Sequence, residues 1–448
     1  MTDIPQRAEI QKPTRASFRL FLVKVLPSDT DLRSLCIDYM PHLLGLFGAG
    51  MSFDAMLNAV LERVEPSELL GLLQTTQFAD RVAKYKHLLV PQTPPDEPRP
   101  LPPDSGRRSL PPPRSAYDST FYVARRDEET QAFDALEFPG AAVVLMGAER
   151  FGKTWLLSQI LSQMEERGRV VNLDLRAFGH ADIMASYSRF LRELARQMLV
   201  NACGMSAEKA AALLDEAWRY SDNPIDNLNS TMKKEVLSQF RDGRMLIIAL
   251  DGVDALSGFP YLEDFFTLLR TWMDNAGRPQ WSALRLLLSL AMPPRLLIQN
   301  VHQSPFNIAT YVYLSDLDDA QVGQLAALHG LTWDGTDRQA LMALVGGHPY
   351  LLRLAMYAAK RHGYSVSELV SASGKARVFA DYLEHCERFL HANPALHDSM
   401  RRILSDPKAP LDFECLDRLR HAGFLVQDDA TGAYRLRYAL FQRLRLGR

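Results

Sequence analysis

The stretch that decides the fold reads Gly147-Ala148-Glu149-Arg150-Phe151-Gly152-Lys153-Thr154, which matches the pattern G-x-x-x-x-G-K-[ST]. An apolar run, 141–146, comes directly before it, and a run with helical periodicity, 155–161, comes directly after it. This order predicts a buried strand, a phosphate-cradling loop and a helix, which together make a nucleotide site. A Gly-rich turn that opens an ordinary helix would explain neither the lysine nor the threonine.

The residue types in this loop fit the chemistry of nucleotide phosphates. The two glycines let the backbone curl so that consecutive N–H groups and the helix N-terminus face the phosphates. Lys153 is predicted to reach the terminal phosphates and to act in catalysis, and the Thr154 hydroxyl is predicted to bind Mg²⁺. We therefore expect ATP or ADP with Mg²⁺ as the ligand, contacted by residues 147–154 and by Trp155.

Composition places the chain among ordinary globular proteins. Its 448 residues are 47% hydrophobic and 23% charged, which suits about three domains. The formal net charge of −2 gives no global field to attract nucleic acid or an anionic membrane, so neither is expected as a partner. The four scattered cysteines, the polar start of the chain and the lack of an apolar stretch of ~18 residues predict a cytoplasmic protein.

A proline-rich segment divides the chain. Ten of the 26 prolines lie between Pro91 and Pro113, which predicts an extended, semi-rigid linker over residues 91–116. A ligand for an aromatic-groove domain is the alternative. Before the linker, residues 1–90 carry helical periodicity and no catalytic pattern, so we expect an all-α bundle that serves as an interaction surface. Cys36 and His42 are expected to be a buried thiol and a helix-capping imidazole.

After the linker the pattern becomes an alternation of strands and helices. Apolar runs at 143–146, 169–175, 245–250 and 284–290, with a short fifth at 310–314, predict a parallel sheet covered on both faces. The predicted domains are an α/β P-loop NTPase core over 117–300, interrupted by a helical insertion at 183–240, then a short strand and helical lid over 301–375. Short helices followed by two strand-like runs predict a winged helix over 376–448.

Two carboxylates follow the third predicted strand. Asp251 ends that strand at the edge of the sheet where ligands of open α/β sheets bind, so it is the candidate metal-side carboxylate opposite Thr154. Asp254 stands three residues later and is the candidate that orients the attacking water. The structural alternatives are a helix N-cap for Asp251 and a solvated turn residue for Asp254.

The chain resembles the signal-transduction ATPases with numerous domains, the STAND class that includes NACHT proteins. Three further motifs resemble its bacterial AAA-like members: Phe121-Tyr122-Val123-Ala124-Arg125, Ser304-Pro305-Phe306-Asn307-Ile308 and Gly346-Gly347-His348-Pro349-Tyr350-Leu351-Leu352. The resemblance implies that Tyr122 and Arg125 lie beside the adenine and that His348 and Pro349 bring the lid against the base. It also implies that the winged helix closes over the nucleotide in the inactive state.

Departures from this pattern predict slow hydrolysis. Gly252 follows Asp251 where motor-type relatives carry a catalytic glutamate, and Ala255 follows Asp254 where NACHT-type members often carry an acid. Ser289 is expected on the γ-phosphate side. Arg150 and Arg285 are candidate phosphate contacts, with ordinary surface arginines as the favoured alternative.

The segments Asp31–Pro41 and Gly50–Phe53 resemble the death-like, effector-associated domains of bacterial conflict proteins. This resemblance implies an ATP-switched signalling ATPase that forms a homo-oligomer with ATP bound and recruits an effector protein through residues 1–90. The implied setting is bacterial antiviral defence or regulated cell death. The alternatives are an AAA-type motor or chaperone, and an ATP-responsive nucleic-acid-binding regulator that would use Arg435, Arg437, Arg443, Arg445 and Arg448.

Overall fold

The computed structural model describes most of the chain: residues 18, 21–22, 24–26, 29–47, 53–61, 63–64, 66–85, 117–178, 181–219, 221–240, 244–297, 309–406, 411–428 and 432–446. The proline-rich segment 91–116 and the motif 304–308 lie outside these residues. The chain divides into two compact units, Met1–Arg108 and Ser109–Arg448. Each unit is described by itself.

The described secondary-structure elements of the first unit are all helices. Its elements are α2 (Asp29–Tyr39), η1 (Pro41–Leu46), α3 (Phe53–Leu61), α4 (Pro66–Gln74) and α5 (Ala79–Tyr85). Their apolar faces meet in one core that contains Phe18, Leu35, Leu57, Val60 and Leu73. Cys36 is fully buried in that core, and burial raises its pKa to about 11, whereas His42 is exposed. The thiol therefore has the character of a small hydrophobic side chain.

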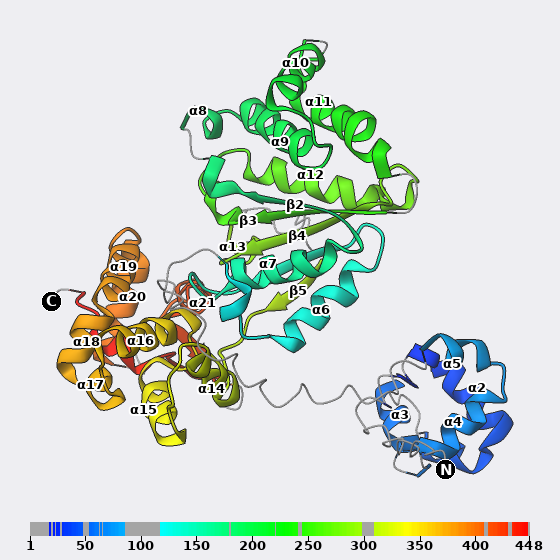
Figure 1. Cartoon of the computed structure of the whole chain (residues 1–448), viewed down its shortest axis with the longest axis horizontal. Helices are drawn as coiled ribbons and strands as arrows, with labels where there is room; N and C mark the ends of the chain where they lie inside the picture. The colour runs from blue at the N-terminus through cyan, green and yellow to red at the C-terminus, as the bar shows by residue number, and fades with distance from the viewer. Residues whose placement is uncertain are drawn as a thin grey trace, which may run out of the picture. The chain divides into compact units, whose positions relative to one another are not determined.

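The second unit is built on a five-stranded parallel sheet, which confirms the predicted α/β core (Figure 1). The strands are β1 (Ala142–Met146), β2 (Gly168–Asp174), β3 (Met245–Asp251), β4 (Leu284–Leu290) and β5 (Thr310–Tyr313), in the order β2-β3-β4-β1-β5. β1 and β4 are buried along their whole length. Because both faces are covered, successive residues of a strand enter different cores.

The two faces of the sheet carry different helices. Val143 and Leu145 join the core on the side of α6 (Arg126–Leu136) and α7 (Lys153–Met164). Val144 and Met146 join the core on the side of α9 (Tyr187–Asn201) and α12 (Leu262–Asp274). Figure 1 shows these two helix pairs on opposite sides of the strands.

The remaining elements of the sheet domain are short or belong to the insertion between β2 and β3. The insertion is helical as predicted, and besides α9 it comprises α8 (Ala181–Met184), α10 (Ala207–Ala217), α11 (Pro224–Thr231), the π-helical η5 (Met232–Val236) and η6 (Leu237–Phe240). The short elements are η3 (Ser119–Phe121), η4 (Leu175–Phe178), η7 (Val253–Leu256), η8 (Asn275–Gly277) and α13 (Pro294–Leu297).

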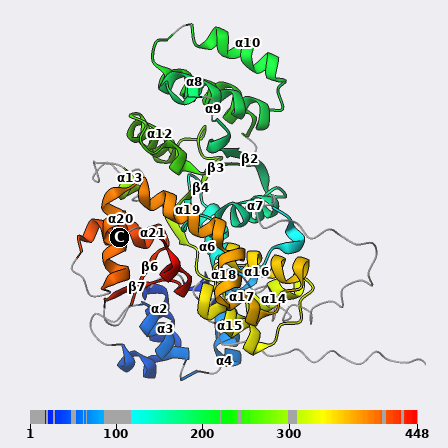
Figure 2. The ribbon, with the colours of Figure 1, turned by 90° about the vertical axis from the view of Figure 1, so that its left-hand side faces the viewer.

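The C-terminal part of the second unit is mostly helical. Its helices are α14 (Asp319–Leu328), α15 (Gly335–Val345), α16 (Pro349–His362), α17 (Val366–Val370), α18 (Ala372–Val378), α19 (Ala380–His391), α20 (Pro394–Ser405) and α21 (Phe413–His421). The chain then forms the antiparallel pair β6 (Leu425–Gln427) and β7 (Tyr434–Leu436), and ends its described elements with η10 (Ala439–Arg443). Figure 2 shows β6 and β7 beside α21.

One hydrophobic core links the C-terminal helices to the sheet. Val143 of β1, Leu351 of α16, Leu419 of α21 and Phe441 of η10 all belong to the same cluster of buried residues. Residues 109–448 accordingly form one compact unit, and the internal boundaries at 300 and 375 stay predictions. A helix followed by an antiparallel pair is the arrangement that a winged helix needs, and that assignment also stays a prediction. Among the described residues, no helix is long and apolar enough to cross a membrane.

The turn between α15 and α16 packs tightly on the chain that leaves β5. A Cβ atom at Gly347 would lie 2.1 Å from the carbonyl oxygen of Leu317 and 2.5 Å from its nitrogen. We predict that Gly347→Ala lowers the free energy of unfolding by about 1–3 kcal/mol, because backbone must move to admit the methyl group. Gly335→Ala is the matched control, since only the Arg338 side chain lies within 4 Å of the added atom. Equal thermal midpoints for the two variants would contradict this prediction.

Candidate nucleotide-binding site

The loop between β1 and α7 has the backbone that a phosphate cradle needs. Gly152, at the N-cap of α7, has φ +94°, and Arg150 has φ +62°, so the loop turns twice through the left-handed region. Lys153 donates from Nζ to the carbonyl oxygens of Gly147 at 2.6 Å and Ala148 at 2.9 Å. Burial lowers the pKa of Lys153, while the nearby carboxylates of Asp254 and Asp251 raise it. The ammonium group therefore lies inside the curl of the loop.

Asp251 is the point where three elements meet. The Thr154 hydroxyl donates to Asp251 Oδ2 at 2.8 Å, and the Ser289 hydroxyl donates to Asp251 Oδ1. Ser289 Oγ in turn accepts from the Gly252 N–H at 2.9 Å. The Asp251 residue is only 3% exposed, and Arg176 forms an ion pair with it. The predicted juxtaposition of Thr154 and Asp251 is thus present in the structure.

The Thr154 and Asp251 oxygens fit a Mg²⁺ ion. A hydroxyl and a carboxylate at hydrogen-bond distance are hard oxygen ligands, and Mg²⁺ is commonly held by one or two such groups together with substrate phosphates and water. No group of three or more His, Cys, Asp or Glu side chains that could hold a metal occurs among the described residues. Any divalent ion held by Thr154 and Asp251 would therefore need oxygens from a ligand or water.

Asp254 has a structural task. Its carboxylate accepts from the N–H groups of Ala291 at 2.7 Å and Met292 at 3.2 Å. Burial raises the pKa of Asp254, and Lys153 and the two N–H groups oppose that shift. Asp254 thereby ties the turn after β3 to the turn after β4. It is not the solvated turn residue of the alternative interpretation, and its role in orienting water stays a prediction.

Arg125 braces the phosphate loop. Its guanidinium donates to the carbonyl oxygens of Ser315 at 2.7 Å and Phe151 at 3.4 Å and pairs with Glu128 at 3.4 Å. Arg125 is 4% exposed, so these bonds are shielded from water. The hydroxyl of Tyr122 donates to Glu129 at 2.7 Å. Both side chains hold α6 and the loop in place, in addition to lining the cavity described next.

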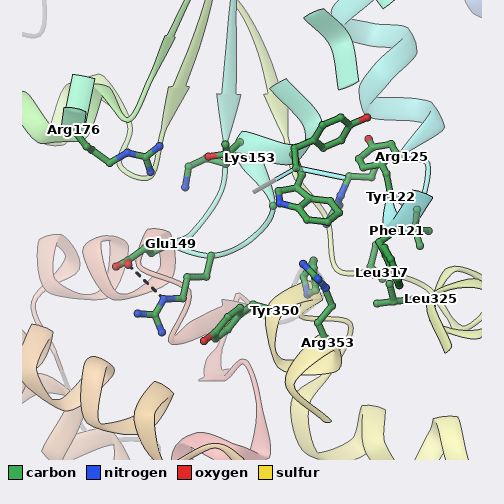
Figure 3. A pocket seen from close by; sticks show the side chains of 17 residues that line it. Phe121, Tyr122, Arg125, Glu149, Lys153, Arg176, Leu317, Leu325, Tyr350 and Arg353 are labelled. Carbon is green, nitrogen blue, oxygen red and sulfur yellow. Dashed lines mark ion pairs between the residues drawn. The ribbon is translucent and has the colours of Figure 1, made fainter. Parts of the chain in front are cut away.

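A cavity of about 370 Å³ opens beside the loop (Figure 3). Most predicted ligand contacts line it: Tyr122, Arg125, Glu149, Arg150, Gly152, Lys153, Thr154, Trp155 and Pro349. Gly147, Ala148, Phe151, Ser289 and His348 do not. In Figure 3, Lys153 and Arg176 lie at one end of the cavity, and Phe121 and Leu325 lie at the other. The cavity therefore has two cations at one end, and toward the other end apolar and aromatic side chains lie beside Arg125 and Arg353.

His348 supports the loop from behind. It is 1% exposed, its ring centroid lies 5.1 Å from that of Phe151, and its Nε2 is 3.2 Å from the Tyr382 hydroxyl. Burial and nearby arginines, Arg437 first, lower the pKa of His348 to about 3. A neutral ring that accepts from the Leu351 N–H at Nδ1 caps α16. Pro349 faces the cavity, whereas His348 contacts the loop.

Arg285 and Arg150, the two candidate phosphate contacts, both make contacts inside the protein. Arg285 is 5% exposed and donates to the Leu136 carbonyl at 3.2 Å, at the end of β4 far from the loop. Both interpretations of Arg285, phosphate contact and surface arginine, are wrong. The Arg150 guanidinium lies over the rings of Tyr350 at 5.1 Å and Tyr382 at 5.8 Å and is mostly buried. Arg150 is therefore no surface arginine.

Sequence reasoning missed several residues of the cavity wall. Arg176, Tyr350 and Arg353 line it, and the guanidinium of Arg353 lies 4.7 Å from the ring of Trp155. Arg353 stands four residues after Pro349 on α16, so helical spacing could have found it once Pro349 was placed. Arg176 follows β2 with no pattern that marks it.

Comparison with known proteins agrees with this geometry. The profile of a family described as AAA-like domain matches residues 110–444. The chain belongs to the AAA-like domain family. This AAA-like domain is similar to the structure of a Walker-type ATPase of Pyrococcus abyssi, with 16% identity and a TM-score of 0.50, over 75% of this chain and 98% of that one.

Two ORC proteins are also similar to the AAA-like domain. The ORC2 protein of Aeropyrum pernix in its ADPNP–ADP complexes shares 14% identity over 72% of this chain and 92% of that one, with a TM-score of 0.45. The ORC1 protein of the same organism in complex with DNA shares 16% identity over 71% and 91%, with a TM-score of 0.39. Among curated proteins, no sequence matches the chain. These likenesses concern the fold alone.

The bonds of Asp254 generate a prediction about stability. Asp254→Ala removes the acceptor of two backbone N–H groups, so we predict that it lowers the free energy of unfolding by about 1–3 kcal/mol in the absence of nucleotide. Asp215→Ala is the matched control, because Asp215 is an exposed partner in a surface ion pair and its loss should cost at most about 1 kcal/mol. Denaturant unfolding of both variants measures the difference. Unchanged stability for Asp254→Ala would leave a purely catalytic role.

Proposed function

We propose that the chain is an ATP-binding, slowly hydrolysing AAA-like switch of the STAND type that oligomerises with ATP bound and signals through its N-terminal unit. One observation carries the nucleotide part. Lys153 and Thr154, which is hydrogen-bonded to Asp251, line one end of a cavity whose other end presents aromatic and apolar side chains beside Arg125 and Arg353. Phosphates suit the first end and a purine base suits the second.

Different residues would bind the phosphates, the base and the metal ion. Backbone N–H groups at the start of α7 and the ammonium of Lys153 would hold the phosphates. Trp155, Tyr122 and Pro349 offer flat or apolar surface for the base. Thr154 and Asp251 would hold Mg²⁺, which when bound supplies positive charge next to the terminal phosphates.

Slow hydrolysis has two supports. Gly252 presents no carboxylate after Asp251, and both oxygens of Asp254 already accept backbone N–H groups. A base that activates water must lie within hydrogen-bond reach of the attacking molecule, and these two bonds hold the Asp254 carboxylate against the turn after β4. A slow ATPase spends most of its time with one nucleotide bound, which suits a switch better than the rival motor or chaperone.

Contacts of the C-terminal segment with the phosphate loop support the switch. The Arg437 guanidinium lies 4.8 Å from the ring of Phe151, and a Cβ atom at Gly423 would lie 2.6 Å from Cβ of Ala148. His385 of α19 is 2.8 Å from the Glu149 carboxylate. A change in the loop that follows the bound nucleotide would therefore reach residues 376–448, the predicted winged helix.

The N-terminal unit supports the signalling part of the proposal. It has its own core, and α2 exposes two large hydrophobic side chains, Ile37 at 58% and Tyr39 at 47%. Exposed apolar side chains of this size suit contact with another protein. The death-like assignment and the setting in bacterial antiviral defence or cell death rest on the sequence resemblance.

A nucleic-acid-binding regulator is the second candidate. Two of the similar structures are of ORC proteins, one of them in complex with DNA, and Arg435, Arg443 and Arg445 are exposed here. Arg437 does not belong to that set, because it pairs with Asp316 at 3.0 Å. Duplex binding that weakens with salt and is lost when the three exposed arginines are neutralised would favour this candidate.

Lys153→Ala tests the nucleotide site. We predict that this variant loses ATP and ADP binding by at least about tenfold, because the charge that faces the terminal phosphates is gone while the fold is kept. Lys209→Ala, at an exposed position of α10, is the matched control and should bind as the unaltered protein does. Calorimetric titration measures both. Undiminished ATP affinity in Lys153→Ala would refute the site assignment.

Deletion of residues 1–90 tests the signalling role. We predict that the shortened chain keeps nucleotide affinity and ATP-driven assembly, because the second unit contains the whole cavity and its own core, but loses the downstream response. Nucleotide titration, particle mass with a non-hydrolysable ATP analogue and a partner-recruitment assay give the three readouts. A shortened chain that still triggers the response would contradict the proposed role of this unit.

A further inference from the structure

Arg176 occupies an unusual place beside the site. It lies in η4, two residues after the end of β2, and donates from Nε to Asp174 Oδ1 at 2.7 Å. Its Nη2 donates to Asp251 Oδ2, which is also the oxygen that accepts from Thr154. The Arg176 side chain is 52% exposed although its partner Asp251 is buried. Arg176 therefore reaches from solvent onto the metal-side carboxylate.

The backbone around Gly252 makes room for this arginine. A Cβ atom at Gly252 would lie 2.8 Å from Arg176 Nε and 3.0 Å from its Cδ, and Gly252 has φ +71°. Any side chain at position 252 would displace Arg176 and would also strain the backbone. The glycine that replaces a carboxylate after Asp251 is thus coupled to the guanidinium that lies against it.

Arg176 borders the phosphate end from two sides. It lines the 370 Å³ cavity with Lys153 and Thr154. It also lines a second cavity of about 490 Å³, on the side of α19 and α21, again with Lys153. Figure 3 shows its guanidinium directed toward Lys153. Two cations consequently face the place where the terminal phosphate of a bound nucleotide would lie.

We infer that Arg176 is a phosphate-sensing arginine within the same chain, which leaves Asp251 and binds the terminal phosphate oxygens when ATP is bound. The inference rests on the proposed function. A metal ion that Asp251 Oδ2 coordinates directly would compete with Arg176, because both cations draw on the same oxygen. Asp174 keeps the guanidinium close, and its planar donors suit phosphate oxygens.

This role separates ATP from ADP. ADP lacks the terminal phosphate, so Arg176 should contribute to binding of an ATP analogue and little to binding of ADP. Arg176→Ala should weaken binding of a non-hydrolysable ATP analogue on the order of tenfold and change ADP affinity less than about twofold. Arg176→Lys, which keeps the charge but loses the planar donors, should fall between the two proteins.

The experiment titrates full-length protein with ADP and with the analogue, each in Mg²⁺. Arg169→Ala is the matched control, since Arg169 is an exposed arginine on β2 whose guanidinium donates to the Asn201 carbonyl and which lies outside both cavities. Unfolding midpoints without nucleotide show that each variant is folded. A selective loss for the analogue supports the inference, and equal losses or no loss for both nucleotides overturn it.

Gly252→Ala provides an independent test. It should reduce the preference for the analogue because the added methyl group displaces Arg176, and the double variant with Arg176→Ala should lose no more than Arg176→Ala alone. Fully additive losses would contradict the coupling of the two residues. If the unaltered protein binds neither nucleotide, the proposed function fails and the inference fails with it; if it binds both and Arg176→Ala binds as the unaltered protein does, only the inference fails.

Discussion

The Asp251 carboxylate is a buried charge, and the fold has to compensate it. Three elements deliver the partners: Ser289 from β4, Thr154 from α7 and Arg176 from η4. Removing a partner from a buried charge is costly, so these elements must arrive together. They do so because β2, β3, β4 and β1 are parallel neighbours whose carboxyl ends meet at one edge. The parallel strand order therefore brings the partners of Asp251 to the edge of the sheet where its charge has to be compensated.

The phosphate loop serves two sides of the molecule at once. Its backbone and Lys153 face the cavity, whereas Phe151 is 1% exposed and packs against His348 and Arg437. Arg125 holds the same loop through the Phe151 carbonyl. A loop that is braced by buried groups keeps its left-handed turns, which would otherwise be strained at Arg150. The helical C-terminal part thus supports the loop from behind and also lines the cavity through Pro349, Tyr350 and Arg353.

Sequence patterns predicted what local rules determine. Continuous apolar runs gave the five strands to within a residue or two at their ends, and the loop pattern placed Lys153, Thr154 and Asp251 together. Arg176 escaped because its partner Asp251 lies 75 residues away and no periodicity links them. Arg285 was misjudged because an arginine in an apolar strand reads as exposed, whereas its guanidinium reaches the carbonyl of Leu136. Long-range partners of this kind appear only once the sheet is assembled.

A bound nucleotide can break the contacts between the phosphate loop and the C-terminal part only if those contacts are weak enough. Arg150 over its two tyrosines and Arg437 over Phe151 are cation–π pairs worth about 0.5–2 kcal/mol each. Glu149, 62% exposed, adds at most about 1 kcal/mol through His385. Their sum is a few kcal/mol, close to the ~5.5 kcal/mol that moves a two-state equilibrium from 1:99 to 99:1. Contacts of this size hold the C-terminal segment against the loop, yet phosphate contacts of ordinary strength can outweigh them.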